Sequence, residues 1–143
     1  MSERLLDVNV LLALVDTKHI HYEPANRWFG RVRSDGWATC PITENAFVRI
    51  LSRPSYPNSP GDVAVTLGML GQLREVASHD FWADDISILD VLEPNRAITP
   101  SQLTDVYLLG LAVHHGGRLA TLDRRIPMHA VRGGGEAIEF VPT

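Results

Sequence analysis

Short apolar segments alternate with helical segments along the whole chain. The apolar segments cover residues 4–6, 37–40, 86–89, 118–122 and 137–141. Helices are expected through residues 11–14 and over residues 24–32, 43–51, 63–76 and 100–115, where apolar side chains recur at helical spacing. Strands that alternate with helices predict an α/β fold with a central parallel sheet of four to five strands, covered by helices on both faces.

Length and composition predict one domain over residues 1–143. The chain has 143 residues, of which 45% are hydrophobic, enough for one core and too little for two ordinary domains. Polar residues interrupt each apolar stretch before the roughly 20 residues of a membrane span, and no secretory pattern is visible, so we expect a cytoplasmic protein. The single cysteine, Cys40, excludes an intramolecular disulfide and an all-thiolate zinc site.

The formal net charge is -4, which argues against binding nucleic acid by bulk positive charge. Of the 13 basic residues only Lys18 is a lysine, and arginine suits bidentate contacts to phosphate. Codon usage in a GC-rich genome would give the same bias. If four carboxylates bind divalent cations, the remaining residues have a net charge of zero. The acidic total is then compatible with a nuclease.

Turn and capping residues set several element boundaries. Residues 52–62 contain three prolines and predict a surface loop between two helices. Thr99 offers an N-cap, with Pro100 at the first helical position and Gln102 at the third, and Gly116 ends that helix. The helix over residues 63–76 has a broad apolar face that either binds a partner helix or is ordinary core.

Two aspartates follow short apolar strands. Asp7 and Asp123 each stand at a strand end, and the working groups of an open parallel sheet lie beyond the carboxyl ends of its strands. Thr121 lies two residues before Asp123, on the same side of the strand, where its hydroxyl could orient a ligand. Taken singly, each aspartate could also simply cap the following helix.

Two further carboxylates fall on the inward faces of helices. Glu44 shares a side with Phe47 and Leu51, and Asp105 shares one with Leu108. An unpaired carboxylate there is costly, and Asp105 lies past the first turn after the Thr99 cap. An arginine partner or a shared divalent metal would compensate these charges, and the set of four favours the metal.

These four positions resemble the motifs of PIN-domain nucleases. Residues 5–12 read LLDVNVLL, residues 43–45 TEN, residues 104–109 TDVYLL and residues 119–123 LATLD, and they cover most of the chain in the family's order. Residues 79–82 (HDFW) and 84–87 (DDIS) resemble the VapC toxin branch. The resemblance implies a PIN-like three-layer α/β/α fold.

The resemblance also implies the activity of a toxin: a Mg²⁺- or Mn²⁺-dependent endoribonuclease that cuts transfer or ribosomal RNA. Oxygen ligands suit these hard cations. The metal ligands would be Asp7, Glu44, Asp105 and Asp123, with Asn9 and Thr121 as supporting residues that fix carboxylate and water geometry. A VapB-like antitoxin and a homodimer are the implied assemblies.

Several interpretations stay open at this point. Arg49, Arg53, Arg124 and Arg125 either contact RNA or form a solvated basic surface. A haloacid-dehalogenase-like phosphatase also has an aspartate after its first strand, but it needs a second one where this chain has Asn9. A catalytically inert PIN-like or receiver-like module would bind RNA or protein without cutting RNA.

Overall fold

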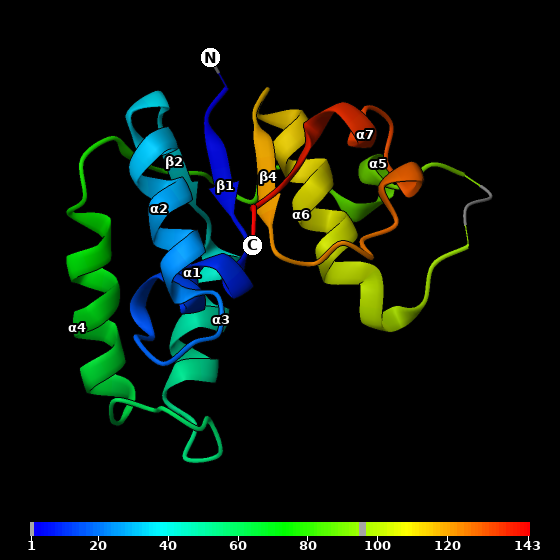
Figure 1. The fold of residues 1–143 in the computed structure, drawn as a ribbon. Helices are drawn as coiled ribbons and strands as arrows, with labels where there is room; N and C mark the ends of the chain where they lie inside the picture. The colour runs from blue at the N-terminus through cyan, green and yellow to red at the C-terminus, as the bar shows by residue number, and fades with distance from the viewer. Residues whose placement is uncertain (1, 95–96) are drawn as a thin grey trace.

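A five-stranded parallel sheet forms the centre of the computed structural model, which describes residues 2–94 and 97–143 (Figure 1). The strand order is β3-β2-β1-β4-β5, and each neighbouring pair is parallel. The strands are β1 (Arg4–Leu6), β2 (Trp37–Thr39), β3 (His79–Phe81), β4 (Arg118–Thr121) and β5 (Ile138–Phe140).

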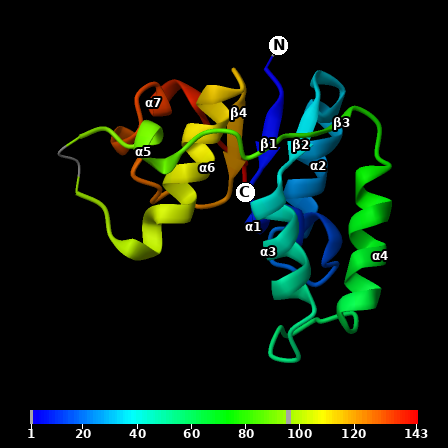
Figure 2. The ribbon, with the colours of Figure 1, turned by 180° about the vertical axis from the view of Figure 1, so that it is seen from behind.

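Helices cover both faces of this sheet, which confirms the three-layer α/β/α architecture. One face carries α1 (Val8–Val15), α2 (Tyr22–Val32), α3 (Pro41–Leu51) and α4 (Val63–Arg74). The other carries α5 (Ile88–Val91), α6 (Leu103–His114) and α7 (Gly134–Ala137), seen from behind in Figure 2. Across the described ranges, no helix is long and apolar enough to cross a membrane.

Successive side chains of the central strands β1 and β4 point to opposite faces of the sheet and contribute to a hydrophobic core on each face. Leu6 and Ala120 belong to the core under α1 and α2, while Leu5 and Leu119 belong to the core under α6. All four side chains are completely buried. Successive residues of a strand point to opposite faces, so a strand buried on both sides is apolar at every position.

One predicted strand is wrong and one strand was missed. Residues 86–89 do not form a strand: Ser87 caps the short helix α5 by accepting a hydrogen bond from the Leu89 backbone N–H. The fifth strand is β3, at the sheet edge, where Asp80 and Phe81 are exposed. A short edge strand with polar residues has no apolar run to mark it.

Most helix boundaries agree with the capping residues. The Thr99 backbone N–H donates to Gln102 Oε1 at 2.9 Å, and a 3₁₀ turn (Pro100–Gln102) precedes α6. Asp105 therefore lies in the first turn of α6, not beyond it. This corrects the expectation that the helix dipole has no bearing on its charge. Helix α3 begins at Pro41, two residues earlier than expected.

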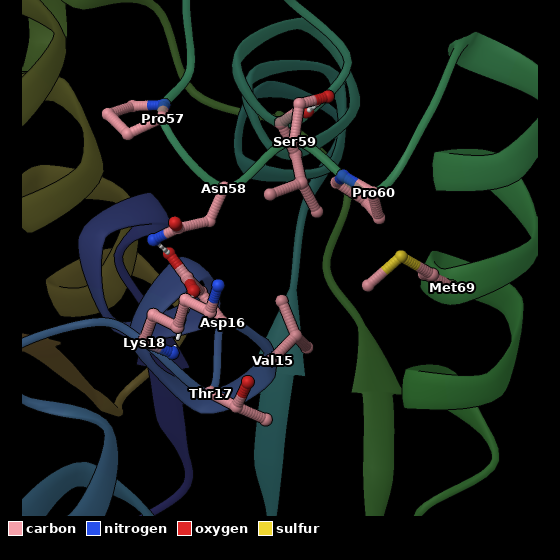
Figure 3. A pocket seen from close by; sticks show the side chains of 10 residues that line it. Val15, Asp16, Thr17, Lys18, Pro57, Asn58, Ser59, Pro60 and Met69 are labelled. Atoms are coloured by element: carbon pink, nitrogen blue, oxygen red, sulfur yellow. Dashed lines mark hydrogen bonds between the residues drawn. The ribbon is translucent and has the colours of Figure 1, made fainter.

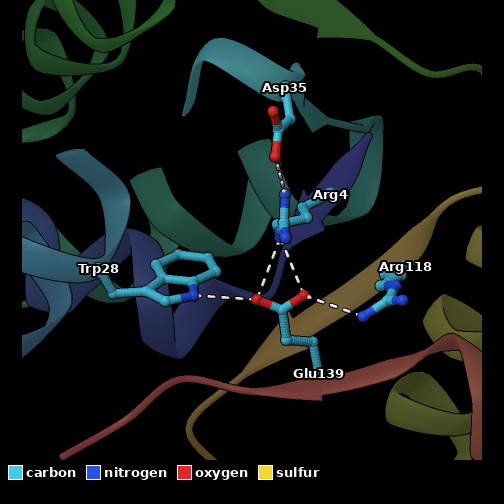
Figure 4. A network of polar contacts seen from close by, with 5 residues as sticks. All are labelled: Arg4, Trp28, Asp35, Arg118 and Glu139. Carbon is cyan, nitrogen blue, oxygen red and sulfur yellow. Dashed lines mark hydrogen bonds and ion pairs between the residues drawn. The ribbon is translucent and has the colours of Figure 1, made fainter. Parts of the chain in front are cut away.

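A polar network centred on Glu139 joins the edge strand β5 to β1, β4 and α2 (Figure 4). Glu139 on β5 accepts hydrogen bonds from Arg4 Nε at 2.9 and 3.0 Å and from Trp28 Nε1 at 2.9 Å. Arg118 Nη1 lies 3.5 Å from the same carboxylate, and Arg4 also pairs with Asp35. Glu139 shows how this fold satisfies a largely buried carboxylate, with two arginines and an indole.

Candidate functional site

Asp7 links the end of β1 to the start of α1. Its backbone is extended, and its Oδ1 accepts a hydrogen bond from the Val8 backbone N–H at 2.7 Å, so it does cap the helix. Its Oδ2 accepts from the Thr121 hydroxyl at 2.8 Å. The side chain is only 2% exposed. Asp7 is therefore a buried carboxylate at the carboxyl edge of the sheet, as its position after a strand predicted.

Thr121 and Asn9 connect this carboxylate to the end of β4. The Thr121 hydroxyl accepts from Asn9 Nδ2 at 3.2 Å and from the Asp123 backbone N–H at 3.0 Å. Asn9 Oδ1 accepts from the Leu122 backbone N–H at 3.1 Å. Both predicted supporting residues thus fix the geometry between the ends of two adjacent strands.

Three carboxylates act on one another at this edge. The pKa of Asp7 is raised to about 6: burial is the largest cause and the negative charges of Asp105 and Asp123 add to it, while the hydrogen bonds from Thr121 and the Val8 backbone oppose the rise. Burial, followed by the charge of Asp123, also raises the pKa of Asp105. Asp7, Asp105 and Asp123 come from β1, α6 and the segment after β4, so tertiary folding has gathered them.

Basic side chains do not compensate this charge in the way that arginines compensate Glu139. In the part of the chain that the structure describes, Asp7 and Asp105 have no ion-pair partner. Arg125 lies 3.6 Å from Asp123, but its side chain is 93% exposed. A buried carboxylate beside two others, without a cation, is the arrangement that a hard divalent cation relieves.

The donor set fits Mg²⁺ or Mn²⁺ in chemistry, although the side chains do not enclose an ion. Among residues 2–94 and 97–143, no three His, Cys, Asp or Glu side chains are grouped so that they could hold one metal. Magnesium keeps several waters and takes one or two carboxylates together with substrate phosphate oxygens. A pair drawn from Asp7, Asp105 and Asp123 satisfies this requirement.

Glu44 has a different set of partners. Its Oε2 accepts from the Thr39 hydroxyl at 2.6 Å and lies 3.3 Å from Arg74 Nη1. His79 Nε2 lies 2.8 Å from the same hydroxyl, on the edge strand β3. Glu44 therefore has the arginine partner that was the alternative to a metal. The structure brings together three of the four predicted carboxylates and pairs the fourth with Arg74.

A groove next to the acidic site contains two residues that the sequence did not single out. It has a volume of about 550 Å³ and is lined by Asn9, His19, His21, Leu122, Asp123, Arg124 and Arg125. His19 and His21 lie in the connection between α1 and α2. Two histidines spaced by one residue, just after the first motif, were the available signal.

Two other hollows lie on the α3 and α4 side. One, of about 640 Å³, runs between these helices and is lined by apolar residues such as Val63 and Leu67, with Arg49 and Arg53 also in its lining. The second, of about 400 Å³, contains Asp16 (Figure 3). The Asp16 carboxylate accepts from the hydroxyl of Tyr56 at 2.6 Å and from Asn58 Nδ2 at 3.1 Å, which fastens the proline-rich loop to the end of α1.

Comparison with known proteins assigns this chain to a family. A model described as "PIN domain" matches residues 4–132. "Ribonuclease VapC44" of Mycobacterium tuberculosis is 47% identical over 90% of this chain and 92% of its own length. "Ribonuclease VapC39" of the same species is 39% identical over 90% of this chain and 94% of its own.

Solved structures with a similar fold have much lower identity. VapBC2 from Rickettsia felis, bound to a DNA fragment from its promoter, matches with a TM-score of 0.62 and 11% identity, covering 98% of this chain and 99% of that one. DNA-bound VapBC from Salmonella typhimurium matches with a TM-score of 0.60 and 16% identity over 99% of this chain and 100% of that one. At these identities the likeness shows the fold.

Proposed function

Because this chain belongs to the PIN-domain family and to its VapC ribonuclease branch, we propose that it is a Mg²⁺- or Mn²⁺-dependent endoribonuclease and the toxin of a VapBC-type pair. The observation that carries the proposal is the buried Asp7 carboxylate, raised in pKa beside Asp105 and Asp123, with no basic partner among the described residues. A transfer or ribosomal RNA is the proposed substrate, and the cytoplasm the proposed location.

Two of the three carboxylates of Asp7, Asp105 and Asp123 would hold the cation together with waters and a phosphate oxygen of the RNA, and the cation would supply water activation and charge neutralisation at the scissile phosphate. The Thr121 hydroxyl donates a hydrogen bond to Asp7 Oδ2, so the carboxylate has a fixed orientation. Asn9 in turn fixes the Thr121 hydroxyl. Because Thr121 on β4 and Asn9 on α1 together restrain it, the Asp7 carboxylate is preorganised and needs little rearrangement when the site fills.

Glu44 could act as a metal ligand only after its side chain changes partners. Its carboxylate would first have to leave Arg74 Nη1, now 3.3 Å away. The Arg74 side chain is 43% exposed, and ion pairs involving exposed side chains contribute little free energy. To join the other three carboxylates, Glu44 would have to give up this ion pair and also the 2.6 Å hydrogen bond from the Thr39 hydroxyl.

Cleavage of total RNA tests the proposal. The parent protein should cut RNA with Mg²⁺ or Mn²⁺ and not with EDTA, while Asp7→Asn and Asp105→Asn should lose activity by at least about a hundredfold. The exposed Asp90 on α5 offers a matched control, Asp90→Asn, which should cut as the parent does. Undiminished cutting by Asp7→Asn, or cutting in EDTA, would refute the metal-dependent mechanism.

Metal binding can also be followed without activity. Mg²⁺ or Mn²⁺ should raise the melting temperature of the parent protein, because a cation relieves the repulsion among the three carboxylates. The gain should be smaller in Asp7→Asn and unchanged in Asp90→Asn. An equal gain in all three proteins would place the metal elsewhere.

A VapB-like antitoxin is the proposed partner, and a homodimer the proposed form of the toxin. Val63 and Leu67 on α4 are each 53% exposed, whereas Leu70 and Leu73 on the same helix are buried in the core. Part of the broad apolar face is thus core and part is open to the α3–α4 groove. An amphipathic segment of the antitoxin would suit that groove.

A further inference from the structure

We propose that His19, His21 and Arg124 form a subsite that binds the nucleotide flanking the scissile bond of a single-stranded RNA. This inference rests on the proposed ribonuclease function and adds the site of substrate contact. The three residues line one groove with Asn9 and Asp123. An RNA strand with a phosphate at the acidic site would therefore place its next nucleotide in this groove. The groove volume of about 550 Å³ lies within the range of pockets that enclose small ligands.

The His19 ring is held by the backbone of His21, two residues further along the chain. Its Nδ1 accepts a hydrogen bond from the His21 backbone N–H at 3.0 Å. A neutral imidazole that accepts at Nδ1 carries its proton on Nε2. His19 therefore has an Nε2–H donor for a phosphate or base oxygen, and its ring orientation is fixed before a ligand arrives.

The connection that carries both histidines is itself ordered. The His19 backbone N–H donates to the Asp16 carbonyl at 2.9 Å, and the Tyr22 backbone N–H donates to the His19 carbonyl at 3.0 Å. Asp16 in turn accepts hydrogen bonds from the Tyr56 hydroxyl and from Asn58 Nδ2, of which Figure 3 shows the second. His19 and His21 thus have a fixed spacing, with ring centroids 5.7 Å apart.

Arg124 adds a guanidinium group to the lining of the same groove. Its guanidinium lies 5.2 Å from the centroid of the Phe140 ring on β5, a contact that holds the charge in place without neutralising it. Guanidinium groups bind phosphate, and histidine rings stack on unpaired RNA bases. A nucleotide carries both a phosphate and a base, so it is the ligand that fits the Arg124 guanidinium and the two imidazole rings together.

Direct binding in a cleavage-deficient background tests this subsite. The probe is a fluorescein-labelled single-stranded RNA of mixed sequence, titrated by anisotropy against the Asp7→Asn protein in EDTA. Adding His19→Ala, His21→Ala or Arg124→Ala should raise Kd about tenfold each, which is the loss of one good contact. Matched controls are His129→Ala and Arg132→Ala, both at exposed positions outside the groove, and they should leave Kd unchanged.

Two conservative variants separate contact from structural support. Glutamine places an amide N–H near the position of histidine Nε2, whereas asparagine places an oxygen near Nδ1. His19→Gln should therefore retain RNA binding better than His19→Asn. The opposite order would show that His19 only supports the turn, and would overturn the subsite.

The remaining outcomes are also decisive. Kd values within twofold of the background protein for all three alanine variants would overturn the proposal. Weakened binding of the antitoxin with unchanged RNA affinity would assign the groove to a protein partner and overturn it as well. Because binding is measured without cleavage, these results are independent of whether the parent protein cuts RNA.

Discussion

The hydroxyl of Thr121 donates a 2.8 Å hydrogen bond to Oδ2 of Asp7, across 114 positions of sequence. This contact joins the carboxyl ends of β1 and β4, which are neighbours in the sheet. It also favours the ionised form of a carboxylate whose burial favours the neutral form. Asp7 is consequently held in one orientation in an environment that a cation would improve.

Asp7 should make the metal-free protein less stable as the pH rises. Its pKa is about 6 in the folded protein and 3.8 ordinarily, so the folded state binds the proton more tightly. The protonated Asp7 therefore adds about 3 kcal/mol to the free energy of unfolding. This stabilisation is fully present below pH 3.8 and is lost as the pH rises through 6. Urea unfolding in EDTA should therefore show equal stability of parent and Asp7→Asn near pH 4 and a more stable variant above pH 6. A constant difference across this range would contradict the assigned pKa.

Removing Arg74 should release Glu44 for metal binding. The 3.3 Å ion pair competes with a cation for the Glu44 carboxylate, and pairs involving exposed side chains contribute at most about 1 kcal/mol. Calorimetric titration with Mn²⁺ should give Arg74→Ala a Kd up to about fivefold lower than the parent. The double variant Arg74→Ala/Glu44→Gln should show no such gain. If Arg74→Ala binds Mn²⁺ as the parent does, Glu44 is not a ligand.

Glu139 should matter for stability and not for cleavage. Glutamine at this position would turn a shared carboxylate into a weaker acceptor for Arg4, Trp28 and Arg118. The free energy of unfolding should fall by about 2–4 kcal/mol, measured by urea denaturation, with RNA cleavage retained at low temperature. Glu136→Gln, at an exposed position on α7, is the control. Equal stability of the two variants would mean that the network is not stabilising.

Gly110 is required where α6 crosses α5. A Cβ there would overlap the Val91 side chain, so Gly110→Ala should destabilise the protein by about 1–3 kcal/mol. Val91→Ala in the same protein should recover part of the loss in thermal unfolding. Gly68→Ala on α4, where a Cβ meets nothing within 4 Å, should instead stabilise its helix. No recovery in the double variant would locate the strain elsewhere.

The α3–α4 groove should be needed for the antitoxin. Leu67→Asp places a charge on a side chain that is 53% exposed there, so affinity should fall while the melting temperature stays within a few degrees. The measurement is co-purification with a co-expressed VapB-like antitoxin. Leu89→Asp, at a side chain 88% exposed on α5, is the control and should bind normally. Retained binding by Leu67→Asp would exclude this groove.

The sequence predicted the fold class and the strand ends because burial leaves a simple local pattern. Strands buried on both faces are continuous apolar runs, and Asp7 and Asp123 stand out where such runs end. The pattern failed at β3, because a half-exposed edge strand needs few apolar residues, and at residues 86–89, where Ser87 caps a helix instead.

Only the tertiary structure decided which charged groups meet. Asp105 and Glu44 were equivalent in sequence, each an acid on the inner side of a helix. Folding placed Asp105 beside Asp123 and Asp7, whereas Glu44 met Arg74 from α4 and Thr39 from β2. The same holds for His19 and His21, whose place in one groove with Asp123 depends on how the connection after α1 packs against the segment after β4. Local periodicity determines which side chains are buried, but the partners of a buried charge come from distant segments and follow from the packing of the whole chain.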